Sequence, residues 1–153
     1  MKIIRLPNEE AKIRTVAQWL YDEFGSGDPA NSVARAVDRL RSQFEGREDV
    51  LFTFVCEASG VLIGTASAIK NDSEAYPELS PWLGAVFVRP EYRGKGIGSL
   101  LCNEVSKELR RIGFAEIFLF TANQQKLYER LGWEVFGTET LKNGKSAVVM
   151  KLK

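Results

Sequence analysis

VRPEYRGKGIGSLL, residues 88–101, joins an apolar run to an amphipathic run through three glycines. Pro90 ends the apolar run, and Gly94, Gly96 and Gly98 follow before helical spacing begins. This order predicts a strand, a glycine-rich turn and the N-terminus of a helix. Such a turn directs several backbone N–H groups to one point, where the helix dipole adds positive potential. Glycine permits positive φ angles and close approach of an anion, so the stretch predicts a pyrophosphate site.

Three kinds of phosphate-binding turn compete for this stretch. A P-loop needs Gly-Lys-Ser/Thr at its end, which residues 94–96 (GKG) do not supply. A dinucleotide fold needs G-x-G-x-x-G and an acidic residue about 20 positions on. Here the third glycine comes one residue early, and Glu116 alone is weak support. The R-x-x-G-x-G turn that holds coenzyme A fits residues 93–98, RGKGIG, at every fixed position.

A second motif lies about 30 residues further on. Residues 121–133, TANQQKLYERLGW, read as a strand end, an Asn, and a helix that carries a Tyr before Leu-Gly-aromatic. With both motifs in this order, the chain resembles the GCN5-related N-acetyltransferase (GNAT) family. The resemblance covers roughly residues 3–152 in element order and is specific over residues 82–101 and 121–133.

The resemblance implies acetyl-CoA as the cofactor. In the family, the strand before the glycine turn splays from its neighbour at a bulge, and the pantetheine arm pairs with its exposed backbone. A backbone N–H of Phe87 or Val88 would then face the acetyl carbonyl. Asn123 would bond the pantetheine arm, or would instead cap a helix over residues 124–131. The residues expected to bind the cofactor are Val86, Phe87, Val88, Arg93, Gly94, Lys95, Gly96, Ile97, Gly98, Ser99 and Asn123.

Tyr128 is the candidate catalytic residue. The resemblance places the equivalent tyrosine beside the coenzyme sulfur, where a phenol with an ordinary pKa near 10 would donate a proton to the leaving thiolate. The alternative is a core tyrosine that packs against the sheet.

The acceptor amine is expected to meet an acidic rim. Asp28, Asp72, Glu74 and Glu78 lie in two loops beside the expected site, which favours a cationic amine. The strand over residues 82–88 contains no acid, so the general base is not assigned, and Glu74 and Glu78 are its nearest candidates. Together with Trp82, they are the residues predicted to bind the substrate.

Composition excludes several classes of function. The 153 residues are 44% hydrophobic with a formal net charge of +1, which predicts a globular chain without a nucleic-acid-binding field. The absence of histidine removes His-based triads and His-ligated metals, so no metal is expected. Cys56 and Cys102 are predicted to be small buried hydrophobes in a reducing, cytoplasmic compartment. No apolar run approaches the roughly 20 residues that cross a bilayer, and no signal peptide is evident.

Hydrophobic periodicity predicts one α/β domain over residues 1–153, with a mixed sheet of about seven strands in the order βααβββαβαββ. Asn8 is expected to cap a first helix, with Ile13, Ala17, Leu20 and Phe24 on one face. Asn143-Gly144 predicts the turn of a closing hairpin. The expected strands are residues 1–6, 50–57, 61–70, 82–88, 115–121, 133–141 and 145–152, and the later helices begin near residue 31 and span 97–111 and 124–131.

The sequence therefore predicts an acetyl-CoA-dependent N-acetyltransferase that acts on a primary amine, with a small cationic metabolite as acceptor. Two alternatives stay open: a protein Lys or N-terminal acetyltransferase, and a non-catalytic acyl-CoA-binding sensor. The closing hairpin offers an exposed edge for a homodimer.

Overall fold

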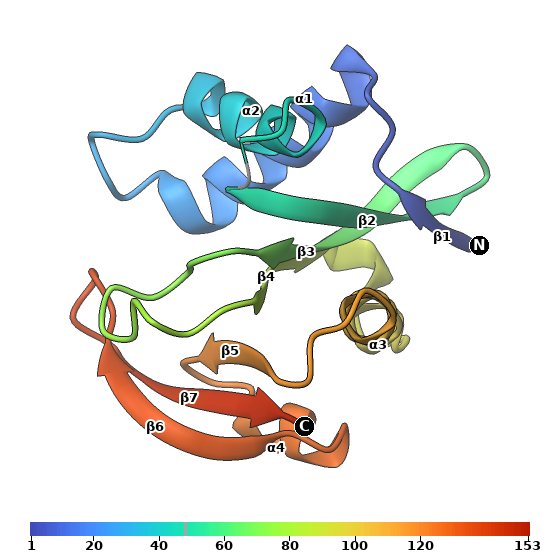
Figure 1. Ribbon diagram of the computed structural model, residues 1–153. Helices are drawn as coiled ribbons and strands as arrows, with labels where there is room; N and C mark the ends of the chain where they lie inside the picture. The colour runs from blue at the N-terminus through green and yellow to red at the C-terminus, as the bar shows by residue number, and fades with distance from the viewer. Residues whose placement is uncertain (48) are drawn as a thin grey trace.

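The computed structural model describes residues 1–47 and 49–153 and contains the predicted elements in the predicted order (Figure 1). The helix over residues 97–111 and the strand over residues 82–88 have the predicted bounds. The strands are β1 (Lys2–Arg5), β2 (Val50–Ala58), β3 (Val61–Ile69), β4 (Trp82–Val88), β5 (Ile117–Thr121), β6 (Glu134–Thr140) and β7 (Ser146–Leu152). The helices are α1 (Glu10–Leu20), α2 (Val33–Arg41), α3 (Ile97–Arg111) and α4 (Gln125–Arg130).

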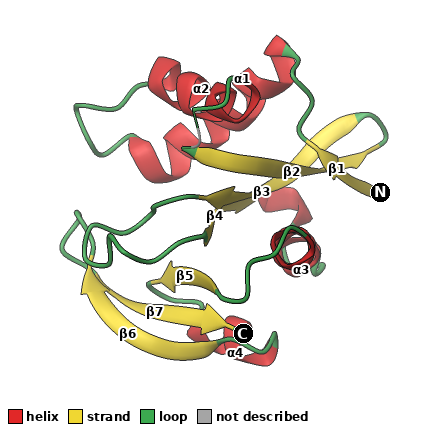
Figure 2. Ribbon diagram, viewed as in Figure 1, coloured by secondary structure: helices red, strands yellow, loops and turns green. Residues whose placement is uncertain are grey.

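The strands form one seven-stranded sheet in the order β1-β2-β3-β4-β5-β7-β6 (Figure 2). Neighbouring strands pair antiparallel except β4 and β5, which pair parallel, so the sheet is mixed as predicted. The β6–β7 hairpin turns at Asn143-Gly144, where Asn143 Oδ1 accepts from the Lys145 N–H at 2.9 Å. Strands β1 and β6 are the two edges of the sheet.

Helices cover both faces of the sheet because its strands alternate apolar side chains between the two sides. Phe54 and Cys56 of β2 belong to a core shared with α3 and Tyr128 of α4. Val55, between them, belongs to a second core shared with α1 and α2. Cys56 and Cys102 are both buried free thiols, which confirms the predicted packing role.

The helix caps differ from those predicted. Glu9, not Asn8, is the N-cap of α1, and it makes no side-chain capping bond. Phe24 is 62% exposed because the helix continues past Leu20 as a wider π-helical turn, Tyr21–Gly25. The wider turn breaks the 3.6-residue period, so a spacing rule places Phe24 on the wrong face.

Strand β4 changes direction at Ala85. Its register against β3 passes from Ser67↔Gly84 to Thr65↔Phe87, so β4 carries an extra residue, a β-bulge. Ala85 has a φ of 52°, which is unfavourable for a residue with a Cβ. Among the described residues, β4 pairs with β5 at a single position, Trp82↔Phe118. Beyond that pair the two strands separate, as the resemblance to the GNAT family implied for the central strand.

Candidate active site

The glycine-rich turn leads directly from β4 into α3. Gly94 and Gly96 have φ angles of 77° and 81°, which only glycine adopts without strain. An ideal Cβ at either position would meet no atom within 4 Å, so the space beside the turn is open. The first helical bond of α3 runs from the Leu100 N–H to the Gly96 carbonyl at 3.1 Å. The N–H groups of residues 97–99 precede it and lack helical partners, which is the arrangement that accepts a phosphate.

Two basic side chains accompany this turn. Arg93 donates from Nε to the Val88 carbonyl at 2.8 Å, and its guanidinium lies 5.5 Å from the Phe87 ring centroid. Lys95 Nζ lies 5.6 Å from the Tyr92 ring centroid. Arg93 therefore fastens the turn to the end of β4, and both cations stand beside the predicted phosphate position.

Among the described residues, the edge of β4 that faces β5 has no strand partner after Trp82, and the Val88 carbonyl on it accepts from Arg93 Nε. The Arg89 N–H donates to the Ile63 carbonyl on β3 at 2.9 Å. Because alternate residues of a strand turn their backbone groups the same way, Phe87 also faces β3, while Val86 and Val88 face the open side. Val88 is therefore the better candidate for the N–H that the sequence assigned to Phe87 or Val88. The open turn and this edge fit the pyrophosphate and the pantetheine arm of acetyl-CoA.

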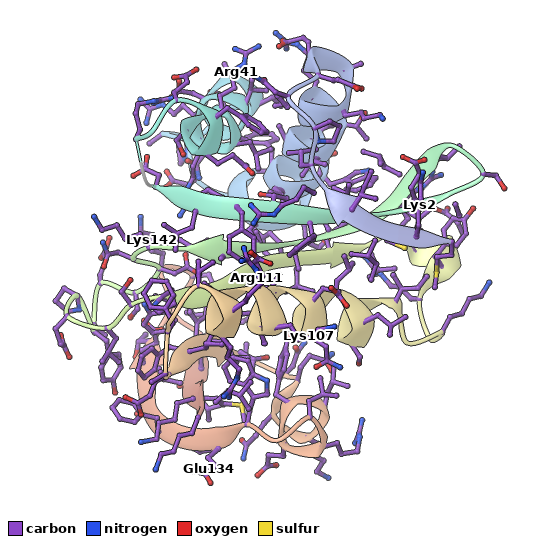
Figure 3. The ribbon with its side chains drawn as sticks, turned by 45° about the vertical axis from the view of Figure 1, so that its right-hand side comes forward. Lys2, Arg41, Lys107, Arg111, Glu134 and Lys142 are labelled. Carbon is purple, nitrogen blue, oxygen red and sulfur yellow. The ribbon has the colours of Figure 1, made fainter. Side chains whose placement is uncertain are left out.

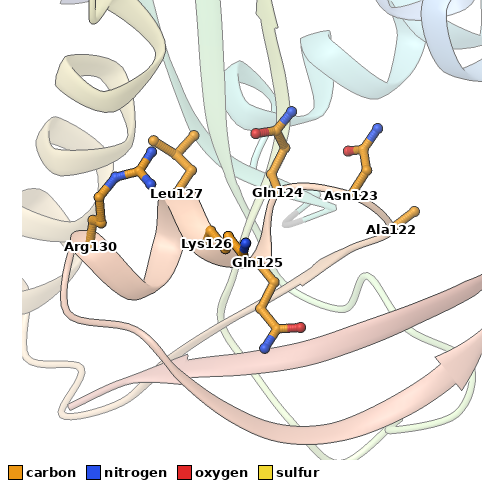
Figure 4. A pocket seen from close by; sticks show the side chains of 7 residues that line it. All are labelled: Ala122, Asn123, Gln124, Gln125, Lys126, Leu127 and Arg130. Atoms are coloured by element: carbon orange, nitrogen blue, oxygen red, sulfur yellow. The ribbon is translucent and has the colours of Figure 1, made fainter.

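A hollow of about 450 Å³ lies at the start of α4, lined by residues 122–127 and Arg130. Figure 4 shows Asn123 and Gln124 pointing to one side of this loop and Gln125 to the other. The predicted capping role of Asn123 is wrong, because Gln124 is the N-cap and its N–H donates to Thr121 Oγ1 at 3.0 Å. The Asn123 side chain is exposed at the hollow, where a contact with the coenzyme stays a prediction.

Tyr128 lies on α4 and points into the core shared with α3. Its side chain is 9% exposed, and its ring packs edge-on against Trp133 at a centroid distance of 6.1 Å. Burial and the neighbouring Cys102 thiol raise the pKa of the phenol well above its usual value. Burial also raises the pKa of Cys102, to about 12. A phenol with its usual pKa near 10 already keeps its proton at neutral pH, so the raised pKa makes Tyr128 a weaker acid. Its burial beside Cys102 matches the alternative of a core tyrosine, and its role as proton donor stays a prediction.

The structure corrects the predicted substrate role of Trp82. Its side chain is fully buried between the strands, where it packs against Phe118 and Phe120 and donates from Nε1 to the Leu79 carbonyl at 2.8 Å. No surface of Trp82 is left for an acceptor. Whether a tryptophan at the start of a central strand is buried depends on the strands that pack around it, and the residue type alone does not reveal this.

Glu74 and Glu78, the other two predicted substrate residues, lie exposed on the loop between β3 and β4. Glu74 Oε1 lies 3.8 Å from Lys142 Nζ at the tip of the β6–β7 hairpin, so its charge is partly offset. The loop is anchored on β6 by Tyr76, which donates from its hydroxyl to the Thr138 carbonyl at 3.1 Å. This anchoring brings the loop and the hairpin to the same end of the sheet.

Asp72, which the sequence placed in the acidic rim without a separate role, is more buried than that prediction implied. It comes from the same loop but folds back onto β4, where its Oδ2 lies 2.7 Å from the position of an ideal Cβ on Gly84. Burial raises the pKa of Asp72 to about 6, Arg39 opposes the rise, and Glu139 of β6 adds to it. Gly84 is the signal in the sequence, because a glycine inside a strand often marks close approach by another group.

Figure 3 labels charged side chains on several elements: Lys2 on β1, Arg41 on α2, Lys107 and Arg111 on α3, Glu134 on β6 and Lys142 in the β6–β7 turn. In the part of the chain that the structure describes, no cluster of three or more potential metal ligands occurs. Over the same residues, no helix has the length and apolar character required to span a membrane.

Comparison with known sequences gives one family and several relatives. Residues 13–133 match the acetyltransferase (GNAT) family model. A probable N-acetyltransferase camello of Xenopus tropicalis is 32% identical over 126 residues, which is 80% of this chain and 55% of that protein. The amino-acid acetyltransferase of Aeromonas salmonicida is 28% identical over 143 residues, 92% of this chain. The chain spans 23% to 30% of the length of the amino-acid acetyltransferases that it matches.

Solved structures share the whole fold at low sequence identity. An aminoglycoside 6'-N-acetyltransferase in complex with coenzyme A has a TM-score of 0.76 and 18% identity, covering 99% of this chain and 96% of its own. The ribosomal-protein-alanine N-acetyltransferase of Brucella melitensis has a TM-score of 0.75 and 19% identity, covering 99% and 98%. A Salmonella typhimurium protein solved with its cofactor acetyl-CoA has a TM-score of 0.74 and 18% identity, covering 100% and 94%. The motifs, the splayed strand and the matching family model agree, and this chain belongs to the acetyltransferase (GNAT) family.

Proposed function

We propose that this chain transfers an acetyl group from acetyl-CoA directly to a primary amine. The observation that carries this proposal is the course of β4, which separates from β5 after Trp82 and enters the glycine-rich turn. One ligand can occupy both features, because its pyrophosphate would meet the N-terminus of α3 while its acyl arm follows the open edge of β4. Acetyl-CoA, when bound, supplies the activated acetyl group.

The first experiment is thermal unfolding with and without acetyl-CoA. A ligand that binds the folded state alone stabilises it by roughly 2.7 kcal/mol at a hundredfold excess over its Kd. For a domain of this size we expect the melting temperature to rise by about 5 to 10 °C. NAD and ATP, which carry phosphates without the pantetheine arm, are the controls. No rise with acetyl-CoA, or an equal rise with ATP, would contradict the coenzyme site.

The chemistry of the site is assigned to two groups of this chain. The Val88 N–H, on the open edge of β4, would stabilise negative charge on the acetyl oxygen. Tyr128 holds a proton near neutral pH and would deliver it to the departing sulfur. Asn123 would contact the acyl arm from the loop before α4. Detectable release of CoA with any amine would separate this function from that of a non-catalytic sensor.

For the acceptor, we propose a small cationic amine that approaches past Glu74 and Glu78. Both carboxylates are exposed, so each contributes at most about 1 kcal/mol to attraction of a cation. We expect Glu74→Gln with Glu78→Gln to raise KM for such an acceptor about two- to fivefold at low salt, with kcat unchanged. Steady-state kinetics of CoA release at two salt concentrations would measure it.

The matched control removes two carboxylates elsewhere, with Glu104→Gln on α3 and Glu134→Gln on β6. An equal rise of KM in both double variants would mean that net charge, and not this loop, attracts the acceptor. The amino-acid acetyltransferases among the relatives support a small acceptor, and the two buried free thiols support the cytoplasm as the proposed location.

A further inference from the structure

Two carboxylates, Asp72 and Glu139, come together where the loop between β3 and β4 contacts β6, and among the described residues neither has a full set of hydrogen-bond partners. Asp72 directs Oδ1 toward Arg39 Nη2, 3.8 Å away, and Oδ2 toward Gly84. Its side chain is 18% exposed, so a small group can still reach it. Glu139 accepts at Oε2 from the Ser73 hydroxyl at 2.9 Å. Its Oε1 is buried and, among the described residues, has no hydrogen-bond partner.

Asp72 can approach β4 at Gly84 because glycine has no side chain there. An ideal Cβ on Gly84 would lie 2.7 Å from Asp72 Oδ2 and 2.7 Å from Ile69 Cδ1, so only glycine admits the carboxylate at this point. The next residue, Ala85, begins the bulge that frees the edge of β4. Asp72 therefore lies directly before the bulge in β4.

We propose that Asp72 is the proton acceptor for the amine and that Glu139 is its positioning residue. This inference rests on the proposed function. A buried carboxylate oxygen without a hydrogen-bond partner lowers the stability of the protein when no ligand is bound, and a cation beside it would remove that cost. The two carboxylates, Asp72 and Glu139, therefore fit an ammonium group. Asp72 takes one proton from the ammonium, and the neutral amine then attacks the acetyl carbon as the carbon–sulfur bond breaks. One ammonium and one thioester thus give one amide, one thiol and one released proton.

The charges that face Asp72 make its ionisation suitable for this task. Burial disfavours the carboxylate, Glu139 on β6 disfavours it further, and Arg39 on α2 favours it. The resulting pKa of about 6 is high enough for proton uptake and low enough to leave the group ionised at neutral pH. Each neighbour therefore offers a variant that shifts this pKa in a known direction.

The test is the pH profile of kcat/KM for CoA release. The acceptor is the fastest member of a panel of L-glutamate, L-lysine, spermidine, kanamycin and an alanine-terminated hexapeptide. For the wild type, kcat/KM should fall below a pH of about 6, where Asp72 becomes protonated. Asp72→Asn should lower kcat/KM at pH 8 at least about tenfold and remove this acid limb. The control is Asp38→Asn, which removes an exposed carboxylate from α2.

Variants of the two neighbours distinguish a catalytic role from a structural one. Glu139→Gln should move the limb to lower pH, because it removes a negative charge that disfavours the carboxylate. Arg39→Gln should move it to higher pH. The same acceptor is used with every variant, so its own pKa does not change between the pH profiles. A shift between the profiles therefore reports a pKa change in the protein. An unchanged limb in Asp72→Asn, or limbs that do not move in opposite directions, would overturn the proposal.

Failure of the proposed function gives a different result from failure of this inference. If acetyl-CoA does not stabilise the wild type, the proposed function fails. If it does but no panel member is acetylated, the carboxyl ¹³C signal of Asp72 in the CoA-loaded protein is titrated with and without spermidine. A bound cation should lower its titration midpoint, and a midpoint that does not move would overturn the role of Asp72.

Discussion

Tyr128→Phe is expected to lower kcat at least about tenfold while leaving the affinity for acetyl-CoA nearly unchanged. The substitution keeps the ring that packs against Trp133 and removes only the hydroxyl. Because a phenol stays protonated near neutral pH, the group that the substitution removes would act as a proton donor and not as a base. Without it, the sulfur must leave as a thiolate or take its proton from water.

Steady-state CoA release measures kcat, and thermal unfolding with acetyl-CoA measures retention of the coenzyme site. Tyr92→Phe is the control, because it removes the hydroxyl of a ring that lies near the Arg89 guanidinium instead. If Tyr128→Phe keeps the wild-type kcat, Tyr128 is a core residue and the proton comes from another source.

Gly98→Asp is expected to weaken acetyl-CoA binding about a hundredfold without unfolding the protein. An ideal Cβ at Gly98 would meet only the Val88 side chain, at 3.7 Å, so the backbone accepts the substitution. An acidic side chain in the first turn of α3 is favourable for the helix by about 0.3 to 1 kcal/mol. The same carboxylate would occupy the N–H groups meant for a phosphate and would repel it. Loss of two charge-assisted hydrogen bonds accounts for a factor of this size.

Isothermal titration with acetyl-CoA gives the affinity, and thermal unfolding without ligand gives the stability. Asn103→Asp adds the same charge to an exposed position further along α3 and serves as the control. Equal affinities for acetyl-CoA in Gly98→Asp and the wild type would show that the start of α3 does not hold the coenzyme.

The elements that sequence analysis predicted well are those with a strong local cause. The bounds of α3 follow from Gly96 before it and Gly113 after it, with a regular apolar stripe between them. The turn over residues 93–98 was predictable because its positive φ angles require glycine at two fixed positions. The bulge in β4 has no such local cause, because Ala85 adopts a φ of 52° against its own preference. It was predicted from the resemblance and not from the residues.

The acceptor side was predicted less well, because its residues come from distant parts of the chain. Asp72 is one of several acids in a long loop, and nothing near it in the sequence indicates that it reaches Gly84. Glu139 lies on a hairpin more than 60 residues later and meets the loop through Ser73. Trp82 was predicted to bind the substrate, although the fold buries it completely. Such contacts depend on how the loop between β3 and β4 is anchored to β6. The hydrophobic periodicity of the sequence carries no information about this anchoring.

The open edge of β4 bears on how such a protein changes over evolutionary time. Its binding groups are main-chain N–H and C=O, which every residue type except proline carries in full. Mutations at Val86 or Val88 therefore change side chains that pack against the core but keep these main-chain donors. Under the proposed function, a lineage is free to exchange acceptors by substituting side chains while it retains the same acyl donor. The solved neighbours, which keep TM-scores of 0.74 to 0.76 at 18% to 19% identity, show how far substitution proceeds within one backbone.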